Sequence, residues 1–339
     1  MPDRHYLSPL DMTADEREHV LARALQLKSA RTPGERSRLR VGSLFLNPSL
    51  RTRISMEQAA WILGAQYQSL NAAVDGWKME MDPSAVMDRD TVENIVEAAR
   101  VLGRYFDVLG IRAFPGSGNW DEERAEPTLR AFAEHSGTTV LSLEGAMHHP
   151  CQSLADVLTM REHFGTDLRG LRVVMRWAWH PRALPMAVSN SFALQAALAG
   201  CRLTICHPEG YDLDPEVMEQ VRAAAGAHGQ EVRVSHDVER GHAGAKVLYV
   251  KSWGRLDLWS DPEAEAAQRV KLRHWIADAG ALAATDDARV MHCLPTRRNV
   301  EIAGDVLDSD RSLVVEQAEN RLWAQAALIE LLAKSKGVI

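Results

Sequence analysis

Residues 41–64 read VGSLFLNPSLRTRISMEQAAWILG, and this stretch contains one complete unit of the predicted fold. Its apolar start, residues 41–46, predicts a short buried strand. Residues 53–64 predict a helix that ends at Gly64. Because a strand followed closely by a helix is the repeating unit of parallel sheets with crossover helices, this stretch favours an α/β fold.

The same alternation continues along the whole chain. In the first half we expect further helices at 14–29, 91–104 and 127–136, and strands at 108–111 and 138–143. In the second half we expect strands at 172–177, 202–206, 231–234, 246–250 and 289–291, and helices at 186–199, 215–228 and 316–334. Two such runs predict two doubly wound parallel-sheet domains, residues 1–147 and 148–315. Residues 316–339 would form a C-terminal helix that returns to the first domain.

Composition excludes several classes of protein. The 339 residues include 39 Lys and Arg against 46 Asp and Glu, and the net charge of −7 argues against a general nucleic-acid or anionic-membrane surface. No apolar run approaches the roughly 18 residues of a membrane span, and residues 1–6 lack the pattern of a signal peptide. Four Cys are too few for a disulfide scaffold. We therefore expect a cytoplasmic protein.

Polar residues follow the predicted strands at the carboxyl edge, where open α/β sheets bind ligands. After the strand 41–46 come Ser49, Leu50, Arg51, Thr52 and Arg53. A helix starts there, and its N–H groups together with the arginines favour an anion such as phosphate. The alternative is a capping serine followed by solvated arginines.

The other strand ends carry the same kinds of side chain: Arg112, Glu144, His149, Gln152, His180, Lys251, Cys293 and, in the last helix, Arg321. Each has a plainer alternative, such as a salt bridge for Arg112, a cap for Glu144 or a surface position for Arg321. A zinc site is poorly supported because His148 and His149 are adjacent and no second pair has finger spacing. Together the residues suit one small, phosphorylated, amide-bearing ligand.

Three ordered motifs resemble those of the aspartate/ornithine carbamoyltransferase family: Ser49-x-Arg51-Thr52-Arg53, His149-Pro150-x-Gln152 and His292-Cys293-Leu294-Pro295. The resemblance covers essentially the whole chain. It implies two α/β domains, a homotrimer with shared active sites, and transfer of a carbamoyl group from carbamoyl phosphate to an amine. It implies no metal and no cofactor.

One departure points to a branch of that family. Ordinary ornithine carbamoyltransferases have an Asp-x-x-x-Ser-Met-Gly motif for the α-amine, and here the strand end reads Val250-Lys251-Ser252-Trp253-Gly254. A lysine suits a carboxylate, and an acylated α-amine carries no charge. This motif, Trp77 and the Pro-bracketed loop 180–185 are similar to the N-acetylornithine and N-succinylornithine carbamoyltransferases. That branch has a knotted chain at the Pro-rich loop.

The resemblance also implies residue roles and partners. Carbamoyl phosphate would be bound by Ser49, Leu50, Arg51, Thr52, Arg53, Arg112, His149, Gln152, Cys293, Leu294 and Arg321. N-acyl-L-ornithine would be bound by Trp77, Val92, Glu144, His180, Lys251 and Leu294, with Trp77 reaching a neighbouring subunit. Arg112, His149 and Thr52 would be catalytic and stabilise the negative oxygen as the δ-amine attacks. Cys293 would contribute its backbone rather than act as a nucleophile.

The acyl group depends on the residue at 92. The resemblance implies a Glu at the position matching Val92 in the N-acetylornithine branch. A carboxylate there would repel the extra carboxylate of a succinyl group. Val92 therefore favours N-succinyl-L-ornithine, with N-acetyl-L-ornithine as the alternative. Glu93 would replace the missing carboxylate if the alignment slips by one residue.

Three other classes of protein compete with this interpretation. A dinucleotide-dependent oxidoreductase requires a Gly-x-Gly-x-x-Gly turn after a strand, and none follows a strand here. A zinc or Cys-His hydrolase would use His148, His149 or Cys293. A binding or regulatory relative would have lost the anion-binding residues, which are all present.

Overall fold

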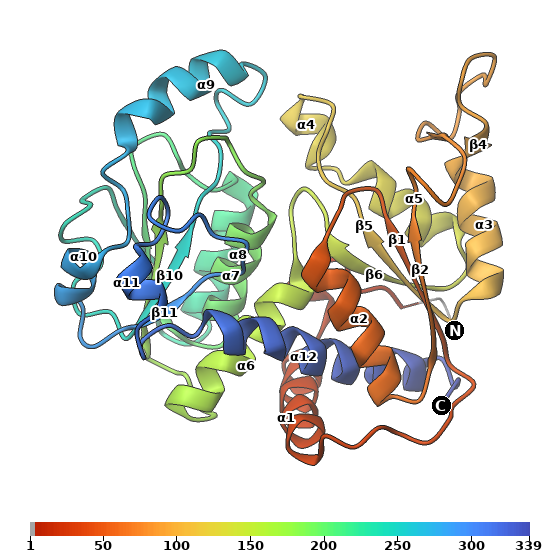
Figure 1. The fold of residues 1–339 in the computed structure, drawn as a ribbon, viewed down its shortest axis with the longest axis horizontal. Coiled ribbons are helices and arrows are strands. Elements are labelled where there is room, and N and C mark those ends of the chain that lie inside the picture. The colour runs from red at the N-terminus through yellow and green to blue at the C-terminus, as the bar shows by residue number, and fades with distance from the viewer. Residues whose placement is uncertain (1–3) are drawn as a thin grey trace. The chain divides into compact units, whose positions relative to one another are not determined.

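The computed structural model describes residues 4–339, and the chain divides into two compact units (Figure 1). Unit 1 comprises Met1–Gly116, Asp121–Leu154 and Arg321–Ile339, and unit 2 comprises Ser117–Trp120 and Ala155–Asn320. The division falls inside helix α6 (Pro150–Phe164) rather than at the expected 147/148 boundary. None of the helices in the described range is long and apolar enough to cross a membrane.

Unit 1 is built on a four-stranded parallel sheet with the order β2-β1-β5-β6. Its strands are β1 (Arg40–Phe45), β2 (Gln66–Asn71), β5 (Val108–Arg112) and β6 (Thr139–Glu144). The prediction of β1, β5 and β6 is confirmed. The edge strand β2 was missed because its sequence, QYQSLN, has no apolar run.

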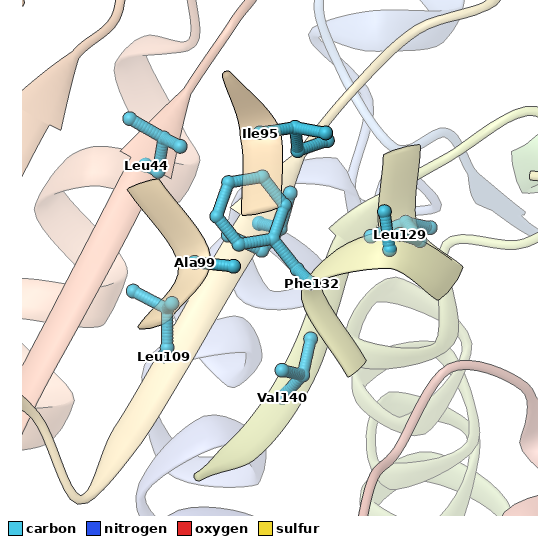
Figure 2. Close-up of a cluster of buried hydrophobic side chains, with 9 residues drawn as sticks. Leu44, Ile95, Ala99, Leu109, Leu129, Phe132 and Val140 are labelled. Atoms are coloured by element: carbon cyan, nitrogen blue, oxygen red, sulfur yellow. The ribbon is translucent and has the colours of Figure 1, made fainter. Parts of the chain in front are cut away.

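Two helices cover one face of this sheet. The core between them and the strands contains Leu44 of β1, Leu109 of β5, Val140 of β6 and Phe132, which are all nearly inaccessible to solvent (Figure 2). The helices are α3 (Ile95–Tyr105) and α5 (Pro127–His135). They approach closely because Gly103 has no side chain: a Cβ there would lie 1.7 Å from the Ser136 carbonyl oxygen.

The remaining helices of unit 1 include α1 (Ala14–Ala30), which the sequence predicted, and α2 (Leu50–Ile62). A short 3-10 helix, η1 (Pro9–Asp11), precedes α1. The expected helix 53–64 begins three residues earlier, because Ser49 caps it, and the chain turns after it at Gly64, where φ is +62°. A positive φ favours glycine.

The predicted helix 91–104 was wrong at its start. It begins at Ile95 with Asn94 as its N-cap. Before it the chain is extended, and β4 (Glu93–Asn94) pairs in parallel with β3 (Met79–Glu80). Val92 therefore lies in an extended segment and not in a helix.

Unit 2 is built on a five-stranded parallel sheet with the order β11-β10-β7-β8-β9. Its strands are β7 (Arg172–Trp177), β8 (Arg202–Cys206), β9 (Arg233–Ser235), β10 (Val247–Lys251) and β11 (Arg289–Met291). All five were predicted, although β9 starts two residues later than expected. Both sheets confirm the α/β class with two parallel-sheet domains.

Helices connect these strands. The predicted helices are α7 (Ala187–Leu198) and α8 (Pro215–Gly226), and Phe192 of α7 stacks on Tyr249 of β10 at 3.6 Å between ring centroids. The short elements α4 (Trp120–Glu123), α9 (Pro262–Arg269), η2 (Val270–Leu272), α10 (Ala279–Ala283) and α11 (Gly304–Leu307) were not predicted.

The last helix, α12 (Val314–Ser335), belongs to both units, because Arg321 onwards is part of unit 1. Arg23 of α1 forms a salt bridge with Glu330 of α12, with 2.7 Å between Nε and Oε2. This confirms the expectation that the C-terminal helix packs back on the first part of the chain.

Candidate active-site residues in the two units

The N-terminus of α2 is the first candidate element. The Ser49 side chain accepts a hydrogen bond from the Thr52 N–H at 3.3 Å, so Leu50, Arg51 and Thr52 form the first helical turn. This turn contains no acidic residue. The N–H groups and the helix dipole therefore favour an anion here, as the sequence predicted.

Thr52, Gln152 and Arg321 form one cluster, although they are far apart in the sequence. Arg321 donates from Nη2 to Thr52 Oγ1 at 2.9 Å and from Nη1 to Gln152 Oε1 at 3.1 Å. Each of the three is at most 3% exposed. Since the two oxygens accept from arginine, the Thr52 hydroxyl hydrogen points away from Arg321 as a donor. The cluster suits phosphate or carbonyl oxygens.

The second cluster contains Arg112, Glu144 and His149. Arg112 is the last residue of β5 and stands beside Glu144 of β6. Glu144 accepts a hydrogen bond from Arg112 Nη1 and lies 3.5 Å from His149 Nε2. Glu144 was predicted to bind the acyl-ornithine, and in unit 1 it orients two predicted catalytic side chains.

The two arginines that flank Thr52 lie on different sides of α2, because positions i and i+2 of a helix do not face each other. The Arg53 guanidinium lies 5.5 Å from the ring centroid of Phe45 in β1. One small anion at the start of α2 is therefore not expected to meet both Arg51 and Arg53.

Trp77 and Val92 lie in the segment that contains β3 and β4. Their side chains are 68% and 61% exposed. The Val92 N–H donates to the Lys78 carbonyl oxygen at 2.9 Å. Trp77 and Glu93 both line a cavity of about 210 Å³, whereas Val92 does not. Since neighbouring side chains of an extended segment point to opposite sides, Val92 and Glu93 face different ways, and Glu93 is the one that shares a cavity with Trp77.

Lys251 is a buried cationic residue of unit 2. It ends β10 beside Trp177 of β7 and is only 7% exposed. Among residues 4–339, no group makes a hydrogen bond with its ammonium, and no carboxylate lies within 4 Å of it. A buried cation without a partner is costly, so this position favours an anionic ligand.

His180 lies in the loop after β7 and is held by Arg297. Its Nε2 accepts from Arg297 Nε at 2.9 Å, and its Nδ1 then donates to the Arg182 carbonyl oxygen at 2.8 Å. Burial lowers the pKa of His180, and the charges of Arg297 and Lys251 lower it further. His180 is therefore a neutral, oriented ring beside Lys251.

Sequence reasoning missed Arg297 and Glu301. Glu301 is 1% exposed, and its Oε1 lies 3.5 Å from Nε2 of the fully buried His292. Burial raises the pKa of Glu301, but hydrogen bonding and charge from His292, together with the charge of Lys251, outweigh it and lower the pKa to about 2. No spacing rule predicts this pairing.

Cys293 and Leu294 follow β11, as expected. Leu294 has a φ of +52°, which is uncommon outside glycine, and its N–H donates to His292 Nδ1 at 2.9 Å. The N–H is thus already used, and the carbonyl is the backbone group of Leu294 left for a ligand. Cys293 is partly exposed, whereas Cys151, Cys201 and Cys206 are buried.

A metal site would require a group of metal ligands among the described residues. No three or more His, Cys, Asp or Glu side chains in residues 4–339 are grouped to hold a metal ion. Burial also raises the pKa of the Cys201 thiol to about 12 and of the Cys206 thiol to about 11.

Comparisons with known proteins agree with the motifs. Residues 4–162 match the carbamoyl-P binding domain of aspartate/ornithine carbamoyltransferases, and residues 185–332 match the Asp/Orn binding domain. The N-acetylornithine carbamoyltransferase of Xanthomonas axonopodis pv. citri is 39% identical over 99% of this chain and 98% of its own length. The N-succinylornithine carbamoyltransferase of Bacteroides thetaiotaomicron is 37% identical over 85% of this chain and 86% of its own.

Solved structures agree as well. An acetylornithine transcarbamylase complexed with acetylcitrulline has a TM-score of 0.94 at 39% identity and covers 97% of this chain and 98% of its own. Another acetylornithine transcarbamylase, with a glutamate-to-valine substitution, is complexed with carbamyl phosphate and N-succinyl-L-norvaline and has the same TM-score. This chain therefore belongs to the aspartate/ornithine carbamoyltransferase family, in the branch of the N-acetylornithine and N-succinylornithine carbamoyltransferases.

Proposed function

We propose that this protein transfers the carbamoyl group of carbamoyl phosphate to the δ-amine of an N-acylated L-ornithine. The products would be N-acyl-citrulline and phosphate, in arginine biosynthesis. The observation that carries the proposal is Lys251, a buried ammonium without a hydrogen-bond partner in residues 4–339, at a strand end. It suits the free carboxylate of an acceptor whose α-amine is acylated.

Unit 1 would bind carbamoyl phosphate. Ser49, Leu50, Arg51 and Thr52 place helix N–H groups and a guanidinium at the start of α2 for the phosphate. Arg321 and Gln152 extend the same set of donors through their bonds to each other and to Thr52.

The reaction forms one bond and breaks one. The neutral δ-amine attacks the carbamoyl carbon, the bond from that carbon to the phosphate oxygen breaks, and the leaving phosphate takes the amine proton. Arg112, His149 and Thr52 would stabilise the negative charge that grows on the carbonyl oxygen. Glu144 would hold Arg112 and His149 in position, and orientation of both substrates would supply much of the remaining rate.

Unit 2 would bind the acceptor. Lys251 and the neutral His180 would hold its carboxylate and acyl amide, and the Leu294 carbonyl would accept a hydrogen bond from the attacking amine. Because this account contains no covalent step at Cys293, the Cys293→Ala variant should retain substantial activity, and a trapped carbamoyl-thioester would contradict it.

Ureido-product formation from carbamoyl phosphate tests the reaction. N-acetylornithine, N-succinylornithine, ornithine and aspartate are offered separately. Product with either acyl-ornithine supports the proposal. Product with aspartate alone, or no product with any of the four, would reject it.

For the acyl group we propose N-succinyl-L-ornithine, with N-acetyl-L-ornithine as the second candidate. Val92 carries no charge and is exposed. The relative with a glutamate-to-valine substitution is complexed with a succinylated ligand, in line with the same charge argument. The acetyl candidate is favoured by the overall identity to acetylornithine relatives and by Glu93, a carboxylate that lines the same cavity as Trp77.

A Val92→Glu variant tests this choice. It should shift the kcat/KM ratio toward N-acetylornithine roughly tenfold or more, since a like charge would face the succinyl carboxylate. Val315→Glu is the matched control, because Val315 is also an exposed valine but lies on α12. A clear preference of the unmodified protein for N-acetylornithine would overturn the succinyl proposal.

We also propose a homotrimer in which the exposed Trp77 reaches the acyl-ornithine in a neighbouring subunit. Sedimentation of the protein and of a Trp77→Ala variant tests this. The proposal is supported if both proteins sediment as trimers and steady-state kinetics shows a raised KM for the acceptor in the variant. A fully active monomer would refute it. The knotted loop at 180–185 stays a prediction.

A further inference from the structure

Unit 2 contains a cavity of about 400 Å³ that the carbamoyl-transfer account does not use. It lies over the end of β7 and is bordered by the loop after β9 and by residues 274–284. Arg176 and His242 are buried residues of its lining, and Glu239 and Asp278 are exposed ones.

Arg176 is 2% exposed and has no hydrogen-bond partner in the described chain for any of its guanidinium nitrogens. Its guanidinium lies 5.5 Å from the ring centroid of Trp275. No carboxylate of residues 4–339 lies within 4 Å of it. Its Nε and Nη1 are buried without a partner, and a guanidinium with unsatisfied buried donors is the usual partner of a carboxylate or phosphate oxygen.

His242 is a second buried polar residue that lines the cavity. It is also 2% exposed, and neither ring nitrogen has a hydrogen-bond partner of good geometry within residues 4–339. Burial lowers the pKa of His242, and the charge of Arg176 lowers it further, against the main chain of Ala281 and the charges of Asp237 and Asp278. The ring is thus a neutral group that can donate one hydrogen bond.

This cavity is separate from Lys251. Arg176 stands beside Val250 of β10 in the sheet, whereas Lys251 stands beside Trp177. Because side chains alternate along a strand, Arg176 and Lys251 point to opposite faces of the sheet.

We propose that this cavity binds the carboxylate of a small zwitterionic metabolite of the α-amino-acid class. Arg176 and His242 bind the carboxylate inside the cavity. The exposed carboxylates of Asp278 and Glu239 attract the ammonium group, and they disfavour a ligand that carries only negative charge.

Calorimetric titration of the full-length protein tests the proposal, with L-arginine, L-alanine, acetate and inorganic phosphate as separate probes. We expect saturable binding of at least one amino acid. Arg176→Met should weaken that binding tenfold or more. Arg273→Met is the matched control, because Arg273 is an exposed arginine 5.1 Å from the ring centroid of Trp179, and it should leave binding unchanged.

Asp278→Asn separates the two ends of the ligand: it should weaken amino-acid binding and strengthen any acetate binding, because a negative charge near the carboxylate is removed. His242→Phe is a second variant of the carboxylate end, for use if Arg176→Met does not fold. Amino-acid binding that is unaffected by both the Arg176 and His242 changes would overturn the proposal. Binding of phosphate alone, or of none of the probes, would also overturn it.

Discussion

At the scale of single residues, Lys251 is the test of acceptor recognition. Lys251→Met removes the ammonium and leaves an apolar side chain of similar length. We expect KM for the acyl-ornithine to rise roughly ten- to a hundredfold, because a charge-assisted hydrogen bond is lost, while KM for carbamoyl phosphate stays unchanged. Steady-state kinetics with each substrate varied in turn measures this.

Lys246→Met is the control for that prediction. Lys246 precedes the same strand, is partly exposed and pairs with Asp286 at 3.1 Å. It should leave both KM values unchanged. Equal effects of the two substitutions would remove Lys251 from the acceptor site.

The pair of Glu301 and His292 gives a prediction about stability and pH. The Glu301 pKa is about 2 in the folded protein against an ordinary value of 4.5, so its contribution to stability is complete above pH 4.5. It is lost as the pH falls from 4.5 toward 2. In urea unfolding at pH 3 to 5, Glu301→Gln should therefore show a flatter loss of stability than the unmodified protein.

Glu316→Gln provides the comparison, because Glu316 is exposed on α12. Its acid dependence should match that of the unmodified protein. If Glu301→Gln also matched it, the charge of Glu301 would not be coupled to folding.

The sequence could predict residues that follow a strand directly, such as Thr52, Arg112 and Lys251, because parallel strands bring their carboxyl ends to one edge. It could not predict pairings such as His180 with Arg297. These two residues are 117 positions apart, and only the folded unit brings them within hydrogen-bond distance.

At the scale of elements, the start of α2 carries the phosphate hypothesis. Arg51→Ala should lower turnover at least roughly a thousandfold, because both the helix dipole and the guanidinium act on the same anion. Circular dichroism should show an intact fold. Carbamoyl phosphate binding and ureido-product formation measure the effect.

Arg53→Ala is the matched substitution on the same helix. Since Arg53 lies near Phe45, its loss should reduce turnover far less. Near-normal turnover of Arg51→Ala, or equal losses in both variants, would reject the role of Arg51.

Helices and strands whose apolar residues recur with a clear period could be predicted from the sequence. Those without such a period were missed. Residues 150–160 of α6 are buried without exception, so the helix has no polar face to reveal its period. Helix α3 starts four residues later than expected because residues 93–94 pair with β3.

At the scale of the whole molecule, we expect the protein to select acceptors whose α-amine is acylated. Ornithine keeps a protonated α-amine, which Lys251 would repel and leave unpaired. The expected discrimination is roughly a thousandfold in kcat/KM.

A single competition measurement tests this claim most directly. The protein is given ¹³C-carbamoyl phosphate and equal concentrations of ornithine, N-acetylornithine and N-succinylornithine, and labelled products are counted by mass spectrometry early in the reaction. Their ratio equals the ratio of the kcat/KM values. We predict that nearly all label enters acyl-citrulline, with the succinyl product in excess. Citrulline as the main labelled product, or equal labelling of all three, would contradict the account.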